Sequence, residues 1–445
     1  MSDEYRLAPL EDEPSSLRAG GNSGFVRRRL RSLDTYRGLI MISLAFAGFG
    51  LAGTARNHLQ ENPESEVWSQ VEFHFTHTQW VGCSYWDLIQ PSFMFMVGVS
   101  LAYSCAKRRR LGHSYIRMFG HAAWRSILLI LLGIFLTSSG RSETNWSLMN
   151  VLTQIGLGYT FLFLMWRRSF ITQAVVAAIV LVSVWVAYFA YPVFDTNAQV
   201  DAEYGAAHVG VSAEWAGQHL EGVDQPWHKN VNIGHRVDVW LLNLIPREEP
   251  FVYNSGGYQT INFIPSFVTM LIGLMCGELL RSDSSAGSKL LVLLLAGAAG
   301  VGIGWLMDAS GYCPLVKRIW TPSWALYSTG WCCLILGALY CVIDILRLGI
   351  LAFPITVVGV NSLAIYCMSM LLKPWTANML ETHFGEQVFR LRARFGHDLY
   401  RLWFVDDAME TTLLAYQPTV QAVLVGLVFW VACFWMYRQR IFVRL

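Results

Sequence analysis

His77 and Asp87 stand ten residues apart, directly before an apolar run, in the stretch HTQWVGCSYWDLIQPSFMFMVG (77–98). Near neutral pH an imidazole can take a proton from an attacking group or act as a nucleophile itself, and a nearby carboxylate can support it. The aspartate also has a structural interpretation, because Asp87 followed by Gln90 is typical of a capping box and Pro91 suits a first helical turn. The pair is therefore a candidate catalytic site. The alternatives are a helix cap at Asp87 and an ordinary loop histidine at His77.

A second pair of ionisable residues, Asp34 and Arg37, opens the first apolar run in the sequence RSLDTYRG (31–38). Residues three apart lie on one face of a helix, so the two side chains can pair. Arg37 lies deeper than the basic cluster before it, and an ionisable group inside a membrane span is costly enough to suggest a function. Anchoring of the helix at the membrane interface is the alternative.

A third group of polar residues lies in PREEPFVYNSGGYQTIN (246–262). Its double glycine allows a turn at which backbone N–H groups face an acceptor. Asn361 interrupts a later apolar run, where an amide can bind a substrate or join neighbouring helices by hydrogen bonds. The candidate substrate-binding residues are Asn254, Gly257, Gln259, Asn262 and Asn361.

Membrane helices must position these groups. Charged residues make up 14% of the 445 residues and hydrophobic residues 54%, whereas about a quarter of a soluble domain is charged. Several continuous runs reach the roughly 20 apolar residues that a helix needs to cross a bilayer. We predict an all-α, polytopic membrane helical bundle of ten or eleven transmembrane helices. Ten spans are expected near residues 36–54, 87–106, 121–138, 148–165, 171–192, 262–280, 288–306, 324–346, 352–372 and 417–437.

Basic residues collect in alternate connections between these spans, for example at 107–110 and 438–444. The positive-inside rule therefore places both termini in the cytoplasm. Residues 1–26 are expected to form a disordered cytoplasmic tail and residues 27–445 the transmembrane domain. Two long outer loops, 193–261 and 373–416, are expected to cap the bundle.

The first outer loop is rich in tryptophan and histidine, a mixture that suits stacking on a sugar or an apolar ligand. Tryptophan also gathers at membrane interfaces, which is the alternative explanation. The residues concerned are Trp215, Trp227, Trp240, His208, His219, His228 and His235.

Composition also restricts the partners. A net charge of +2 gives no argument for nucleic acid, and the sequence contains no CxxC pair, so we expect no metal site of that type. No soluble catalytic domain and no internal repeat is visible in the sequence, so any chemistry or transport belongs to the bundle and its loops.

Five blocks occur in one order along the chain: SLDTYRG (32–38), the His77 to Asp87 spacing with DLIQPSFMFMVG, GGYQTINFIPS (256–266), WALYSTG (324–330) and GVNSLAIY (359–366). Together they resemble the heparan-alpha-glucosaminide N-acetyltransferase family, including its bacterial homologues. The resemblance runs from about residue 27 to the C-terminal RQRIFVRL.

This resemblance implies an acyl-CoA-dependent acetyltransferase in the membrane. It would take acetyl groups from cytoplasmic acetyl-CoA and deliver them to an amine or hydroxyl of a saccharide acceptor on the far side. His77 matches the active-site histidine of the family and Asp87 lies at the matching position after it. Asp34 and Arg37 are expected near the path of acetyl-CoA. His77 can serve as a general base or as a nucleophile that forms an acetyl-imidazole.

The sequence departs from the animal members of that family at Gly48, Gln154 and Ser369, where they have asparagine, arginine and histidine. A non-animal acceptor sugar and a bacterial inner membrane are therefore expected. A homodimer in the lipid bilayer is compatible with this architecture. The alternatives are a transporter or permease for a small polar or sugar-type solute, and a catalytically silent scaffold. A transporter often shows an internal repeat with broken helices, and none is visible in the sequence.

Overall fold

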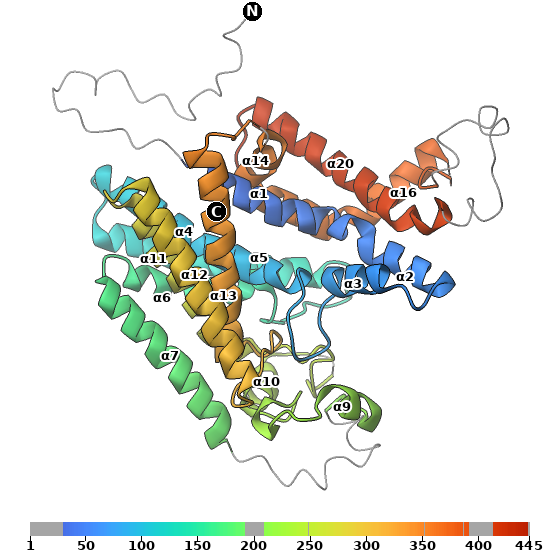
Figure 1. Ribbon diagram of the computed structural model, residues 1–445, viewed down its shortest axis with the longest axis horizontal. Coiled ribbons are helices and arrows are strands. Elements are labelled where there is room, and N and C mark those ends of the chain that lie inside the picture. Colours follow the sequence, from blue (N-terminus) through green and yellow to red (C-terminus); the bar gives the residue numbers. More distant parts are fainter. Residues whose placement is uncertain are drawn as a thin grey trace, which may run out of the picture. The chain divides into compact units, whose positions relative to one another are not determined.

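The structure, a computed structural model, describes residues 30–191, 209–247, 249–350, 352–385, 387–390 and 413–443. Within these ranges the regular secondary structure is helical (Figure 1), apart from one isolated β-bridge between Val81 and Val316. The expected tail 1–26, His208 and parts of both long loops lie outside the described residues.

The predicted spans coincide with helices, which confirms the all-α membrane bundle. Among the described residues, seven helices are long and apolar enough to cross a membrane. Two bent helix pairs raise the number of candidate spans to nine if each pair counts as one span. A shorter apolar helix, α6, is 15 residues long. The chain is thus an integral multi-pass membrane protein. The helices are α1 Arg31–Ala45, α2 Leu51–Glu61, α3 Glu66–Phe75, α4 Ile89–Arg110, α5 Tyr115–Ser138, α6 Val151–Met165, α7 Phe170–Ala190, α9 Ala213–His219, α10 Ile233–Leu242, α11 Phe263–Arg281, α12 Ala286–Ala309, α13 Pro322–Leu339, α14 Phe353–Val360, α15 Ser362–Leu371, α16 Lys373–Phe384 and α20 Gln417–Arg438.

Two of the expected spans are broken. The first bends by 47° between α1 and α2, through the short helix η2 Ala47–Gly50. Gly48 and Gly50 there have φ of 61° and 68°, a left-handed conformation that suits glycine and cannot continue an α-helix. The ninth span bends by 80° between α14 and α15, at Asn361.

The helices α4 and α11 pack tightly at the centre of the bundle (Figure 1). A Cβ atom on Gly98 of α4 would overlap the carbonyl oxygen of Met270, and one on Gly273 of α11 would overlap that of Phe95. Small residues of this kind let two membrane helices approach until their backbones touch. The pair therefore forms a rigid core from which the ends of α4 are positioned.

The described part of the long connection 193–261, here called the cap, shares an apolar cluster with α7, the His77 loop and the connection between α12 and α13. Trp80 and Trp227 lie at its centre, 1% and 0% exposed, and the indole N–H of Trp80 donates to the carbonyl of Trp227 at 3.0 Å. Trp240, by contrast, is exposed. The cap thus uses Trp227 for packing and holds the loop around Trp80 from outside.

The close approach of α4 and α11 makes a matched pair of glycine substitutions informative. We expect Gly98→Ala to destabilise the protein by about 1–3 kcal/mol, because the methyl group overpacks the contact with α11. Gly302→Ala on α12 meets nothing within 4 Å and should be neutral or slightly stabilising, since alanine is the better helix former. Thermal unfolding in detergent measures both. Equal melting temperatures for the two variants would contradict the packing described.

Candidate active site

The loop that carries His77 connects α3 to α4 and is fixed from outside by a second loop. Val81 forms the β-bridge with Val316, and the N–H of Gly82 donates to the carbonyl of Leu315 at 2.9 Å. These contacts bring the connection between α12 and α13 against the start of α4. The neighbouring residues of both loops thereby face one another.

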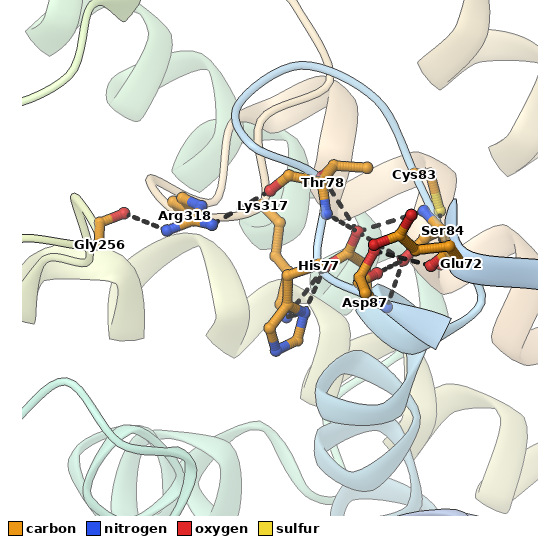
Figure 2. Close-up of polar contacts among 10 residues, drawn as sticks. Glu72, His77, Thr78, Cys83, Ser84, Asp87, Gly256, Lys317 and Arg318 are labelled. Atoms are coloured by element: carbon orange, nitrogen blue, oxygen red, sulfur yellow. Dashed lines mark hydrogen bonds and ion pairs between the residues drawn. The ribbon is translucent and has the colours of Figure 1, made fainter. Parts of the chain in front are cut away.

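Asp87 lies in the short helix η3, Trp86–Leu88, and its carboxylate is 1% exposed. Its Oδ1 lies 2.8 Å from His77 Nδ1. Its Oδ2 accepts hydrogen bonds from the backbone N–H groups of Thr78 and Ser84, at 3.1 and 3.2 Å, and from both hydroxyls, at 3.0 and 2.9 Å (Figure 2). The carboxylate therefore ties the His77 loop together. No side chain caps the start of α4, so the capping box considered for Asp87 does not form.

Lys317 is a third member of this cluster that the sequence interpretation missed. Its Nζ lies 3.0 Å from His77 Nδ1 and 3.2 Å from Asp87 Oδ1, and its side chain is 4% exposed (Figure 2). One feature could have pointed to it. Lys317 and Arg318 form a basic pair in a connection assigned to the outer side, which runs against the positive-inside pattern.

The imidazole of His77 is held in a form suited to accepting a proton. Partial burial lowers its pKa below the ordinary value of 6.5; the charges of Lys317 and Arg318 lower it further and Asp87 acts in the opposite direction. The ring is consequently neutral at pH 7. Because an ionised Asp87 can only accept, the 2.8 Å contact between Oδ1 and Nδ1 places the proton of the neutral ring on Nδ1, while Lys317 donates to Asp87. Nε2, which points away from Asp87 and Lys317 in Figure 2, then keeps a free lone pair.

Arg318 braces the site against the polar segment 254–262. Its guanidinium donates to the carbonyl of Gly256 at 2.7 Å and to that of Thr78 at 3.2 Å, and it lies 5.5 Å from the Tyr258 ring centroid. Asn262 in turn donates to the Arg318 carbonyl at 2.8 Å. The segment 254–262 therefore adjoins the His77 loop through Arg318.

The other candidates in this segment make contacts within the protein. Asn254 accepts from the N–H groups of Gly256 and Tyr258, at 2.9 and 3.1 Å, which forms a tight turn. Gly257 has φ of 77°, and a Cβ there would press on the ring of Trp80. The Gln259 side chain accepts from Tyr188 and donates to Asn232, at 2.7 and 2.6 Å. These residues shape the wall around Trp80 and Arg318.

Asp34 and Arg37 form the expected ion pair, 3.4 Å apart, on α1. Arg37 also donates to Ser100 of α4. Ser100 lies 13 residues beyond Asp87 (100 − 87), which at 1.5 Å per residue is about 20 Å along the helix. The structure therefore separates this pair from His77 and does not gather all candidates into one site.

Asn361 lies at the break between α14 and α15. Its amide nitrogen donates to the carbonyl of Ile441 at 3.0 Å, and its oxygen accepts from the N–H of Val443 at 3.1 Å. Both ends of this amide thus hold the segment after α20. The sequence left two roles open for Asn361, substrate binding and the joining of helical segments. These contacts correspond to the joining of helical segments.

Comparison with known proteins adds a relationship to this geometry. No protein-family model matches the chain. The chain is 24% identical over 371 residues to the heparan-alpha-glucosaminide N-acetyltransferase of Homo sapiens and 23% identical over 396 residues to that of Mus musculus. These alignments cover 76% and 81% of this chain but only 52% and 56% of the relatives. The chain thus spans about half the length of the curated relatives it matches.

The chain is similar to the heparan-alpha-glucosaminide N-acetyltransferases over most of its length. This confirms the resemblance expected from the five sequence blocks. At Gly48, one of the three positions where the sequence resemblance predicts a difference from the animal proteins, a Cβ would press on the rings of Phe75 and Trp86. The Trp86 ring centroid lies 6.4 Å from that of His77. The residue type at position 48 therefore affects the space beside His77.

The other two positions at which such a difference is predicted, Gln154 and Ser369, lie elsewhere. Gln154 donates to the carbonyls of Leu148 and Thr260, at 2.8 and 3.0 Å, and so supports the start of α11. Ser369 in α15 donates to the carbonyl of Tyr366 at 2.8 Å. Among the described residues, no group of three or more His, Cys, Asp or Glu side chains is arranged to hold a metal ion.

The network around Asp87 predicts a specific cost of removing its charge. Asp87→Asn replaces one acceptor oxygen by an NH₂ group, which faces hydrogen-bond donors and leaves them unpaired. We expect a loss of about 1–3 kcal/mol in the free energy of unfolding. The matched control is Asp224→Asn, in the exposed part of the cap, which should be within about 0.5 kcal/mol of wild type. If both variants melt at the wild-type temperature, the carboxylate does not hold the loop.

Proposed function

We propose that the protein is a transmembrane acetyltransferase that moves acetyl groups from cytoplasmic acetyl-CoA to an amine or hydroxyl of a saccharide on the other side of the membrane. The observation that carries this proposal is the buried Asp87 carboxylate that orients a neutral His77 with a free Nε2. The relatives named as N-acetyltransferases support the reaction class.

His77 supplies the proton transfer that this reaction requires. As the acceptor nitrogen or oxygen attacks the thioester carbonyl, its proton passes to Nε2 of His77. The C–S bond then breaks and the proton goes to the departing thiolate of CoA. In the covalent variant, Nε2 attacks the thioester first and the acceptor then takes the acetyl group from the imidazole. Asp87 holds the ring in the productive tautomer in both variants.

The donor requires positive charge for its phosphates. We assign Arg37, oriented by Asp34, to the path of acetyl-CoA. A second basic group lies near the same end of α4, where Arg108, His121 and Arg125 line a small cavity between α4, α5 and α6. Arginine is well suited to phosphate recognition. Arg125 therefore provides a direct comparison for Arg37.

The acceptor is expected at the outer mouth of the site, next to His77. The substrate-binding candidates Asn254, Gly257, Gln259 and Asn262 form the adjoining wall through Arg318. Asn361 would act at a distance, through the segment that follows α20. The acceptor saccharide therefore meets the chain mainly at the His77 loop and the cap.

The orientation follows from the charges at the helix ends. Basic helix ends alternate along the chain with helix ends that face the cap. The basic ends carry Arg108, Arg168, Arg281 and, at the C-terminal end of α20, Arg438. The positive-inside rule assigns these basic ends and both termini to the cytoplasm. His77 and the cap then face the opposite side.

Transfer can be measured in sealed inverted vesicles, with acetyl-CoA outside and a set of amino sugars enclosed. We expect acetylated sugar inside wild-type vesicles, and for His77→Ala a rate at least about 10²-fold lower with unchanged binding of acetyl-CoA. Because the His77 pKa is lowered, kcat/KM should stay constant from pH 8 to pH 7 and fall only below about pH 6.5.

His113→Ala, in the connection on the cytoplasmic side, is the control for loss of a histidine. Full transfer by His77→Ala would contradict the proposed mechanism. Transport of unmodified sugar without acetylation would instead favour a permease.

Donor binding distinguishes the two basic groups. Loss of one charge-assisted hydrogen bond to a phosphate should weaken acetyl-CoA binding by about 1.5–3 kcal/mol. We expect this result for Arg37→Ala in titration calorimetry. Arg125→Ala tests the cavity in the same assay. If only Arg125→Ala weakens binding, the phosphates of acetyl-CoA bind in the cavity between α4, α5 and α6 and not at Arg37.

A further inference from the structure

Lys317 occupies an unusual environment for a lysine. Its side chain is buried in the connection between α12 and α13, at the end of the bundle that carries the His77 loop. Isolated buried ammonium groups are unfavourable, and they persist when a partner of opposite charge compensates them. Asp87 Oδ1, 3.2 Å away, provides that compensation.

The backbone around Lys317 is fixed independently of this ion pair. The N–H of Val316 donates to the Thr321 hydroxyl at 3.1 Å, and that hydroxyl donates to the carbonyl of Pro314 at 2.7 Å. Trp320 donates its N–H to the Lys317 carbonyl at 3.0 Å. Together with the bridge to Val81, these bonds direct the lysine at the His77 loop before any substrate is bound.

We propose that Lys317 is a positioning residue for the acetyl transfer: its ammonium fixes the Asp87 carboxylate and keeps the imidazole of His77 unprotonated until the acceptor gives up its proton. The inference rests on the proposed function of His77. It assigns to Lys317 a role in setting the protonation of the base, beyond packing of the loop.

The charges around the ring explain this role. A proton on Nε2 in the resting site would place an imidazolium nitrogen 3.0 Å from Lys317 Nζ, and the two cations would share the Asp87 carboxylate. Arg318 adds a further positive charge near the ring. The thiol of Cys83, which lies near Asp87, is neutral because burial raises its pKa to about 12. The cluster thus favours a neutral His77 in the absence of substrate.

The same repulsion assists the second half of the reaction. When Nε2 takes the proton of the acceptor, the C–N or C–O bond forms and the imidazolium lies beside Lys317. The imidazolium is then a stronger acid than an isolated one, so it returns the proton to the CoA thiolate as the C–S bond breaks. No co-reactant other than the donor and the acceptor is needed, and the site returns to its neutral state.

The decisive measurement is the pH dependence of kcat/KM for Lys317→Met and Lys317→Arg. Removal of the cation raises the His77 pKa, so the acid limb of the profile should move to higher pH. At a pH on the acid limb, a displacement of about one pH unit lowers the rate relative to the plateau by up to about tenfold. Lys317→Arg keeps the charge and should keep the wild-type profile. Lys289→Met, at the far end of α12, is the control for loss of a lysine.

A purely structural lysine gives a different result. Lys317→Met would then lose stability while the pH profile of the remaining activity stayed unchanged, and that outcome overturns the proposal. Histidine-selective ¹³C NMR, with the His77 signal assigned by its loss in His77→Ala, reports the titration directly in the wild-type protein. It decides the question even where Lys317→Met is too unstable to assay, because a wild-type His77 that titrates at or above pH 6.5 also overturns the proposal.

The two proposals fail in different ways. If His77→Ala keeps full transfer, the mechanism at His77 is wrong whatever Lys317 does. If His77→Ala is inactive but Lys317→Met has the wild-type pH profile, only the role of Lys317 is wrong. A displaced acid limb in Lys317→Met together with an inactive His77→Ala supports both.

Discussion

The structure around His77 depends on the interactions of the buried carboxylate of Asp87. A carboxylate that is 1% exposed is stable only if donors replace its hydration. Its two oxygens meet side-chain or backbone donors from the His77 loop and the ammonium of Lys317, which arrives from a connection between two other helices. The loop, the start of α4 and the connection before α13 must therefore fold together, and the position of His77 follows from their agreement.

The bilayer sets the second constraint. Backbone groups inside hydrocarbon must find partners within the protein, so the spans are helical and each break needs its own compensation. At the break between α14 and α15, the N–H of Asn361 donates to the carbonyl of Val358 at 3.1 Å, and the Asn361 side chain joins the break to the backbone at Ile441 and Val443. A polar residue in an apolar run can thus indicate a break in a helix that is held by hydrogen bonds within the protein, as well as a ligand site. The contacts of the residue distinguish the two cases.

The sequence could predict those features that depend on hydropathy or on residues close together in the chain. The spans were predictable because bilayer thickness and hydropathy fix their length. The pairs His77 with Asp87 and Asp34 with Arg37 were predictable because their members are close in sequence and share a loop or a helix face. Lys317 was not, since its contact with His77 joins residues 240 positions apart. The bends at Gly48 and Asn361 were also missed, because hydropathy does not register backbone angles.

The separation of Arg37 from His77 along α4 fits a reaction that crosses the membrane. Under the proposed function, the phosphates of acetyl-CoA are too strongly hydrated to enter the bundle, so they would remain near Arg37 while the uncharged arm carries the thioester toward His77. That arm needs a route with hydrogen-bonding groups. The interface of α1 with α4 and the His77 loop contains them, since Tyr36 donates to Ser92 at 3.0 Å.

Farther along α1, Ser43 lies 2.6 Å from the hydroxyl of Tyr85, a residue of the His77 loop. These polar contacts continue along the interface of α1 with α4 from the level of Arg37 to the level of His77. Under the proposed function, a donor arm that passes along this interface must exchange these bonds for hydrogen bonds to its own polar groups.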